Sequence, residues 1–207
     1  MDLYASPMAC SLASHITALE AGLPVTVHYV NSNKKTDDGA DYHKIAPNGY
    51  VPALKLASGQ ILNEGASVLQ YLADQKPSAK LAPAWGTPER YQLIDTLNYF
   101  ATEVHKHLFS PIFATSASDA AKAEAKAQLN PTLDYIAKRL GDREFLVGDS
   151  FTVADAYLVT LMNWFRFVGC DFKRWPALDA YYQRHLERPA VKKAMAEEMA
   201  ERQRRAA

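Results

Sequence analysis

Residues 3–12 read LYASPMACSL, which predicts a short apolar strand leading into a helix, with Cys10 at the junction. Unpaired backbone N–H groups at a helix start, together with the positive end of the helix dipole, favour the thiolate over the thiol. Lowering a cysteine pKa by about two units needs roughly 2.7 kcal/mol of differential stabilisation. The alternative is a small buried hydrophobe, because free cysteine is among the most buried residue types. The rest of the sequence favours the reactive cysteine.

The composition indicates one large or two modest domains in 207 residues. Lys plus Arg (23) balance Asp plus Glu (23), so there is no basic field and we expect no nucleic acid partner. Cys10 and Cys170 lie too far apart in sequence to suggest a disulfide framework, which is typical of a reduced cytoplasmic protein. No segment reaches the roughly 18 apolar residues of a membrane span, and the start of the chain lacks a basic region. We therefore expect a soluble, intracellular protein without a membrane partner.

The first third of the chain alternates strand and helix patterns. Strands are predicted at residues 3–4, 25–30, 53–56 and 60–62, and helices at 12–19, 41–46 and 64–75. Residues 57–59 form a short turn between the last two strands. The order β-α-β-α-β-β-α predicts a small α/β domain with a mixed sheet.

A change of composition follows at residues 77–88, which contain three prolines and are typical of a linker. Every later periodic segment is helical. These helices are predicted at residues 93–108, 121–140 with an interruption from Pro131, 154–167, 177–187 and 190–202. Residues 201–205 are a charged tail, expected to be solvated and frayed. We therefore expect domains over residues 1–76 and 89–207.

A capping box opens the helix that begins at residue 154. Thr152 is the predicted N-cap, and Asp155 is placed to reach back to a free backbone N–H. Both residues are therefore predicted to be structural.

The dipeptide Val51-Pro52 comes directly before the strand at residues 53–56. A cis bond here would turn the Val51 backbone N–H and C=O outward, where they could pair with an extended peptide. An ordinary trans proline is the alternative, and the residues alone favour it because only about 5–6% of X-Pro bonds are cis.

Residues 63–67, NEGAS, stand at the start of another helix. Glu64 could hold a ligand ammonium while the exposed N–H groups hold a carboxylate, a pair that recognises an α-amino acid terminus. The alternative is a glutamate that only complements the helix dipole. Lys34 and Lys35 are either a solvated loop pair or the source of one cation for a ligand carboxylate.

The first long helix carries polar residues that could take part in binding or catalysis. At α-helical spacing Asn98 and His105 share a face and can point at one cleft, with Lys106 beside that face and Glu103 nearby. His105 and His107 project to different faces, and no further Cys or carboxylate has ligand spacing, so we expect no metal.

Taken in order, these motifs resemble a bacterial beta-class glutathione transferase over nearly the whole chain. The motifs that carry the resemblance are ACSL at 9–12, KKT at 34–36, NGYVPAL at 48–54, EGA at 64–66, LNYF and EVHK at 97–106, and FTVADAY at 151–157. The resemblance implies an α/β thioredoxin-like N-terminal domain, an all-α C-terminal domain and a homodimer. Glutathione would be the co-substrate.

The resemblance also implies roles for single residues of the peptide site. Cys10 would face the glutathione sulfur, in some members as a mixed disulfide. Val51 would pair its backbone with the cysteinyl unit, with Pro52 cis. Glu64 would hold the γ-glutamyl end, together with the N–H groups of the two residues that follow it, Gly65 and Ala66.

The remaining implied residues are cationic or come from the helical half. Lys34, His105 and Lys106 would approach the thiol or the glycine carboxylate, and Asn98 and Glu103 would reach the site from the other subunit. The catalytic pair would be Cys10 and His105.

The resulting hypothesis is nucleophilic conjugation, in which a glutathione thiolate, stabilised by the helix start and a positive His105, attacks a small hydrophobic electrophile. Disulfide exchange through Cys10 is a second chemistry. A dehalogenase or peroxidase would differ from this conjugating enzyme only in the electrophile. The alternative class is a non-catalytic protein that binds glutathione or apolar ligands. The second site is expected among four aromatic residues, Phe109, Phe113, Trp164 and Phe167, although such residues more often form core.

Overall fold

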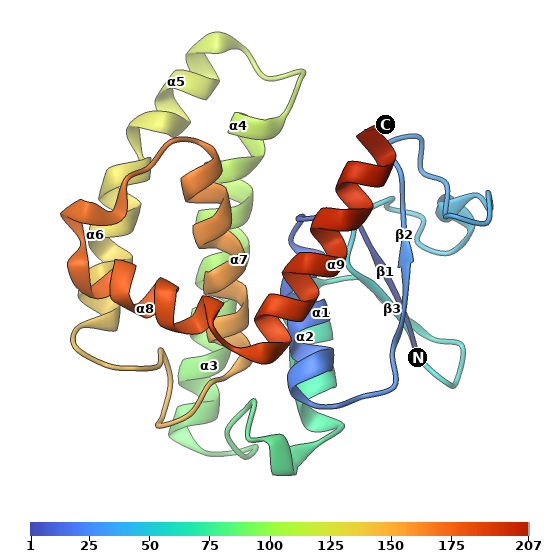
Figure 1. Cartoon of the computed structure of the whole chain (residues 1–207), viewed down its shortest axis with the longest axis horizontal. Helices are drawn as coiled ribbons and strands as arrows, with labels where there is room; N and C mark the ends of the chain where they lie inside the picture. The colour runs from blue at the N-terminus through green and yellow to red at the C-terminus, as the bar shows by residue number, and fades with distance from the viewer. Residues whose placement is uncertain (207) are drawn as a thin grey trace. The chain divides into compact units, whose positions relative to one another are not determined.

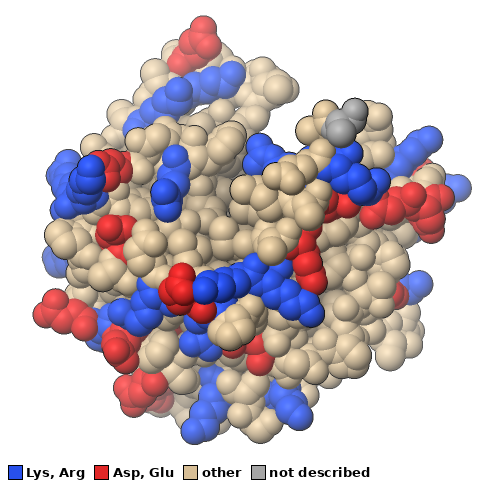
Figure 2. Space-filling model, in the orientation of Figure 1, with Lys and Arg blue, Asp and Glu red and all other residues tan. Residues whose placement is uncertain are grey.

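The computed structural model describes residues 1–206 and contains two compact units (Figure 1). The first unit consists of Met1–Ala82 with the residues from Glu187 onward, and the second unit is Pro83–Leu186. Figure 2 shows Lys and Arg interspersed with Asp and Glu over the face that it displays. Within the described residues, no helix has both the length and the apolar character that crossing a bilayer requires.

A four-stranded mixed sheet forms the centre of the first unit. Its strands are β1 (Asp2–Ala5), β2 (Thr26–Tyr29), β3 (Ala53–Lys55) and β4 (Ile61–Leu62), in the order β2-β1-β3-β4. β1 is parallel to β2, because helix α1 (Ser11–Glu20) connects them as a crossover, whereas β1–β3 and β3–β4 are antiparallel. The predicted mixed sheet of a thioredoxin-like domain is confirmed.

Alternating side chains of β1 enter two apolar clusters, one on each face of the sheet. Leu3 pairs in register with Leu54 and belongs to one cluster with Leu72 of α2 (Gly65–Asp74). Tyr4, the next residue of β1, packs on the opposite face with Tyr42. Tyr42 lies in a short 3-10 helix, η1 (Tyr42–Lys44), where the sequence predicted a helix at 41–46.

The second unit is entirely helical in its regular elements. These are α3 (Pro88–Tyr99), the π-helix η3 (Phe100–Phe109), α4 (Ser110–Phe113), α5 (Asp119–Ala127), α6 (Leu129–Leu140), α7 (Val153–Phe167), η4 (Phe172–Arg174) and α8 (Pro176–Leu186). The helix predicted at 121–140 is divided into α5 and α6, because Pro131 has no N–H to donate to the carbonyl of Ala127. The expected helical domain is confirmed.

Helix α7 is buried on nearly every side and begins with the predicted capping box. The Asp155 carboxylate accepts hydrogen bonds from the Thr152 N–H (2.8 Å) and hydroxyl (2.9 Å), from the Leu146 N–H (2.9 Å) and from the Tyr181 hydroxyl (2.7 Å). Burial raises the pKa of Asp155, and these four donors act in the opposite direction. Asp155 therefore joins the start of α7 to the preceding loop and to α8.

The last helix, α9 (Pro189–Ala206), belongs to the first unit, where it packs against α1 (Figure 1). The Arg188 guanidinium donates to both carboxylate oxygens of Glu20 on α1, at 2.6 and 2.9 Å. The sequence placed this helix in a helical domain over 89–207, because a helical period does not tell which unit buries its apolar face.

The end of α9 is ordered, in contrast to the frayed tail expected at residues 201–205. Arg204 and Arg205 form ion pairs with Glu201 one turn earlier, and Arg205 also pairs with Asp37 in the loop after β2. Pairing with two arginines lowers the pKa of Glu201 to about 2. Three of the four charges that suggested a solvated tail, those of Glu201, Arg204 and Arg205, are therefore engaged in ion pairs.

Candidate functional site

Cys10 is the N-cap residue of α1, as the sequence predicted. The side chain is half-buried, and its thiol donates a hydrogen bond to the Val51 carbonyl oxygen at 3.1 Å. The preceding loop is closed by Ser11, whose hydroxyl accepts from the Ser6 N–H (3.1 Å) and donates to the Ser6 carbonyl (3.2 Å). The loop and the helix start therefore place the thiol beside the main chain of Val51.

A glutamate from the far end of the chain holds the same loop. Glu198 of α9 is fully buried and accepts a hydrogen bond from the Met8 N–H at 2.6 Å, where Met8 has a φ of +62°. Its other oxygen lies 3.1 Å from Nδ1 of His15 on α1. Glu198 was not among the residues predicted from the sequence. The one signal for it is its helical spacing from Val191 and Ala194, which are buried on the same face.

Two side-chain contacts fix the segment before β3. The buried Tyr42 hydroxyl donates to the Tyr50 carbonyl at 2.7 Å, and the Lys34 ammonium donates to the Gly49 carbonyl at 2.8 Å. Gly49 is required here, because its φ is +67° and an added Cβ would lie 2.7 Å from the His43 ring. Lys34 is therefore held against the segment that contains Val51, and its contact with a ligand carboxylate stays a prediction.

The Val51-Pro52 peptide bond is cis, although the residues alone favoured trans. The Pro52 ring also lies near the start of α2. A Cβ added to Gly65 would be 3.8 Å from Pro52 Cδ. Pro52 therefore lies between the strand β3 and the first turn of α2.

The N-terminus of α2 is not capped by a side-chain hydrogen bond. Glu64 is its N-cap residue, and its carbonyl accepts hydrogen bonds from the N–H groups of Ser67 (3.0 Å) and Val68 (2.9 Å). Helix geometry leaves the N–H groups of Gly65 and Ala66 without intrahelical partners. The Glu64 side chain makes no capping hydrogen bond and is exposed. A carboxylate and two helix-start N–H groups are thus available to a ligand.

Contacts within the first unit connect these groups. The Cys10 thiol contacts the Val51 carbonyl, and Pro52, the next residue, lies near the start of α2, where a Cβ added to Gly65 would be in van der Waals contact with its ring. The groups together are a thiol, a strand-like main-chain segment, an anion-binding helix start and a carboxylate. This set suits an extended peptide that carries an α-amino acid terminus and a thiol.

His105 lies in η3 of the second unit, and its Nδ1 is 2.9 Å from the Tyr157 hydroxyl. Its ring packs edge-to-face against Trp164, with ring centroids 4.9 Å apart. Burial, and then the charge of Lys106, lower the pKa of His105 to about 4. At this pKa the imidazole is neutral near pH 7, in contrast to the positive His105 expected from the sequence.

The other polar residues of this segment point elsewhere. Asn98, Glu103 and Lys106 are exposed, whereas His105 packs against side chains of α7. A π-helix has i→i+5 hydrogen bonds and more residues per turn, so the face expected for Asn98 and His105 from α-helical spacing does not apply. Among the described residues, no group of three or more His, Cys, Asp or Glu side chains is arranged to hold a metal.

The four aromatic residues singled out from the sequence contact one another in the second unit. Phe109 lies 5.4 Å from Trp164 between ring centroids, and both are buried in the core. Phe113 stacks on Phe109 at 5.5 Å and contacts Phe167 at 6.2 Å, and these outer rings are 43% and 67% exposed. Two members are therefore core, and two present an apolar surface.

Comparison with known proteins supports the resemblance. Residues 7–75 match the family described as Glutathione S-transferase, N-terminal domain, and residues 100–189 match Glutathione S-transferase, C-terminal domain. Glutathione S-transferase GstA of Escherichia coli O157:H7 is 41% identical, over 96% of this chain and 98% of that protein.

Solved structures agree with the sequence comparison. A sphingomonad glutathione S-transferase complexed with glutathione has a TM-score of 0.92 and 42% identity, over 96% of this chain and 98% of that one. A beta-class glutathione S-transferase from Sphingomonas chungbukensis has the same TM-score, 0.92, the same identity, 42%, and the same coverage of the two chains, 96% and 98%. The chain therefore belongs to the glutathione S-transferase family and, within it, to the bacterial beta class.

Proposed function

We propose that this transferase binds glutathione in an extended form on its first unit and joins the glutathione sulfur to a small hydrophobic electrophile. The observation that carries the proposal is the contact series from the Cys10 thiol through Val51 and Pro52 to the open start of α2. The solved relative complexed with glutathione supports the choice of peptide.

Each part of the tripeptide has a matching group. The γ-glutamyl ammonium would contact Glu64, and its carboxylate the N–H groups of Gly65 and Ala66. The cysteinyl unit would form main-chain hydrogen bonds with Val51, as an added strand does. The glycine carboxylate would contact the ammonium of Lys34, which has three donors and gives one to the Gly49 carbonyl.

The reaction follows from where the sulfur lies. Beside the start of α1, partial positive charge stabilises the glutathione thiolate. The thiolate attacks the electrophilic carbon, a carbon–sulfur bond forms, and the leaving group departs with its electron pair. Because His105 is neutral near pH 7, we assign it the role of a hydrogen-bond partner in place of a cation. The exposed rings of Phe113 and Phe167 are the apolar surface proposed for the electrophile.

Disulfide exchange is the second proposed chemistry, and the Cys10–Val51 hydrogen bond supports it. The cysteinyl N–H of bound glutathione would compete for the Val51 carbonyl and free the Cys10 thiol from its acceptor. The Cys10 thiolate would then attack a glutathione disulfide, break its S–S bond, form a mixed disulfide and release one glutathione thiolate. The thiolate of another small thiol would then attack the glutathione sulfur of the mixed disulfide, form a new disulfide with glutathione and release the Cys10 thiolate.

We propose a homodimer in which Asn98 and Glu103 contact the glutathione of the partner subunit. Both residues are exposed near the junction of α3 and η3. Co-expressed Glu64→Ala and Glu103→Ala subunits would test the arrangement. If Glu103 acts on the partner's site, mixed dimers hold one intact site and activity recovers to about a quarter of wild type by random pairing. If it acts within its own subunit, neither site recovers.

The main test separates binding from turnover. Calorimetry with glutathione is paired with conjugation of a chlorodinitrobenzene, in wild type and in Glu64→Gln. The variant should weaken glutathione binding roughly tenfold, because it removes a charged partner of the ammonium. Glu89→Gln is the matched control, since Glu89 is an exposed helix-start carboxylate of α3.

The outcomes distinguish the hypotheses. Equal, small effects of both substitutions would mean that Glu64 only complements its helix dipole. Glutathione binding without turnover of any electrophile would favour the non-catalytic binding protein.

A further inference from the structure

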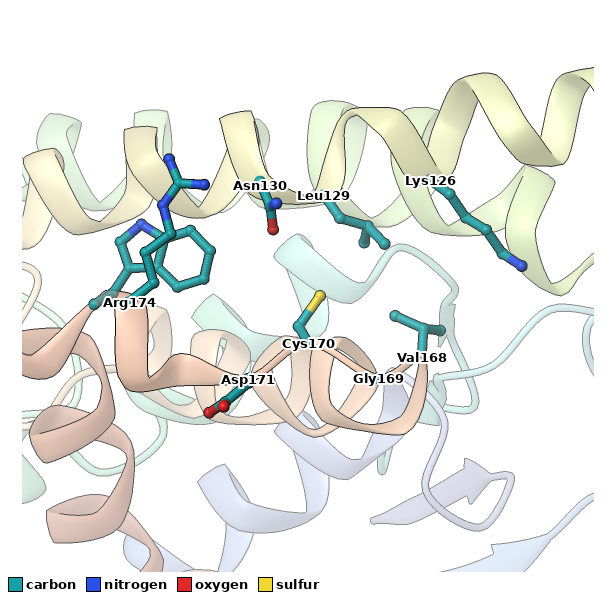
Figure 3. A pocket seen from close by; sticks show the side chains of 9 residues that line it. Lys126, Leu129, Asn130, Val168, Gly169, Cys170, Asp171 and Arg174 are labelled. Atoms are coloured by element: carbon teal, nitrogen blue, oxygen red, sulfur yellow. The ribbon is translucent and has the colours of Figure 1, made fainter.

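A cavity lies wholly within the second unit, at a place where two helical elements end. It has a volume of about 400 Å³, within the range of small-molecule pockets. One wall comes from the junction of α5 and α6, where Pro131 interrupts the helix, and the other from the turn between α7 and η4 (Figure 3). None of its lining residues belongs to the groups proposed above to hold glutathione.

The walls of the cavity are partly apolar and well fixed. Leu129 and Trp175 are buried, and the Trp175 indole N–H donates to Asp134 at 2.7 Å, which fixes the ring. The Cys170 sulfur points into the space between the two walls (Figure 3). The Cys170 N–H donates to the Phe165 carbonyl at 2.9 Å, so the main chain that carries the thiol is tied to the end of α7.

The charge at the cavity is unbalanced. Lys126 is exposed at the rim, and in residues 1–206 its ammonium has no ion-pair partner. Arg174 is a second cation, paired with Asp134 at 3.2 Å. The carboxylate among the lining residues, Asp171, points away from the space (Figure 3) and accepts from the Lys173 N–H at 3.1 Å. An anionic group at the rim would therefore meet a cation without displacing an existing partner.

We propose that this cavity is a second ligand site, which takes a small organic anion with a flat apolar body and one carboxylate or sulfonate. The body would lie between Leu129 and Trp175 over the Cys170 sulfur, and the anion would contact Lys126. Cys170 is not used as a nucleophile, and burial raises the pKa of its thiol. The thiol instead reports on whether the cavity is occupied.

The chain has two cysteines, so a Cys10→Ser background leaves Cys170 as its single thiol. The probe is anilinonaphthalene sulfonate, and the readout is the rate at which neutral iodoacetamide alkylates Cys170. Saturating probe should slow alkylation by about tenfold, with a midpoint equal to the Kd from probe fluorescence. Probe bound elsewhere on the protein would raise fluorescence without protecting the thiol, and that result would overturn the proposal.

Two substitutions in the same background test the proposed contacts. Lys126→Gln should weaken the protecting Kd about three- to tenfold, whereas Lys138→Gln, which removes an exposed lysine of α6 outside the lining, should leave it unchanged. Asn130→Trp places a large ring on an exposed lining position and should remove protection. Equal protection in Lys126→Gln and Lys138→Gln would refute the role of Lys126, and circular dichroism confirms that each variant is folded.

Discussion

The two units present their functional atoms in different ways. The peptide groups proposed in the first unit are largely main-chain atoms, from Val51 and from the start of α2 at Gly65. The groups proposed in the second unit are side chains, His105 and the exposed rings of Phe113 and Phe167. A main-chain surface depends on the fold and tolerates side-chain changes, whereas a side-chain surface changes with each substitution. Recognition of the tripeptide would thus vary less than the choice of electrophile.

The largest expected effect concerns Cys10, the one chemically reactive side chain among the first-unit groups. Cys10→Ala should reduce glutathione-dependent disulfide exchange to the uncatalysed rate, because no thiolate remains to form the mixed disulfide. Conjugation of a chlorinated arene should persist in large part, since its nucleophile is the glutathione sulfur. Both rates are measured on the same preparation, with Cys170→Ala as the control. If conjugation falls as far as exchange, Cys10 serves both reactions and this division is wrong.

The second unit should depend strongly on one buried carboxylate. Asp155→Ala leaves four donors without their acceptor, and should lower the free energy of unfolding by about 3 kcal/mol or more. Chemical denaturation followed by circular dichroism measures the loss. Asp149→Ala, at a loop position just before the capping box, is the comparison. A loss below about 1 kcal/mol for Asp155→Ala would show that water satisfies the donors.

A pH effect should arise from His105, because its pKa is about 4 in the folded chain and about 6.5 when unfolded. Above pH 6.5 the imidazole is neutral in both states and contributes no pH dependence. As the pH falls from 6.5 to 4, the unfolded chain binds a proton that the folded chain does not, so stability decreases, by about 3 kcal/mol in total.

The measurement is the free energy of unfolding at several pH values for wild type and His105→Gln. The difference between the two curves should be flat above pH 6.5 and slope below it. A constant difference through this window would mean that His105 titrates normally in the fold.

The smallest expected effect concerns the exposed aromatic pair. Phe113→Ala or Phe167→Ala should lower kcat/KM for an apolar electrophile by about three- to tenfold, since each removes part of an exposed ring surface. The KM for glutathione should stay unchanged, which is what separates the two surfaces. Tyr135→Ala, another exposed ring in the same unit, should change neither constant. A matching shift in the glutathione KM would contradict the separation.

Local features could be predicted from the sequence because neighbouring residues determine them. Cys10 at a helix start, the interruption by Pro131 and the Thr152–Asp155 capping box each follow from a few adjacent residues. The missed features depend on residues far apart in the chain. Glu198 contacts Met8 across 190 positions, and no spacing rule connects the two.

The lowered pKa of His105 could not be predicted from the sequence for a related reason. Its position in the sequence shows a histidine next to a lysine, but the pKa depends on burial against Tyr157 and Trp164. The π-helix likewise changes which side chains share a face, and the residue pattern alone did not indicate it.

The hydrogen bond that Glu198 accepts from the Met8 N–H, in the loop before Cys10, has a consequence for synthesis on the ribosome. A nascent chain that has completed all four strands still lacks the carboxylate that accepts from the Met8 N–H. The loop before Cys10 acquires this anchor only after α9 has been translated and has packed against α1. Final placement of the thiol is therefore a late event in the maturation of the protein, although the cysteine is among the first residues made.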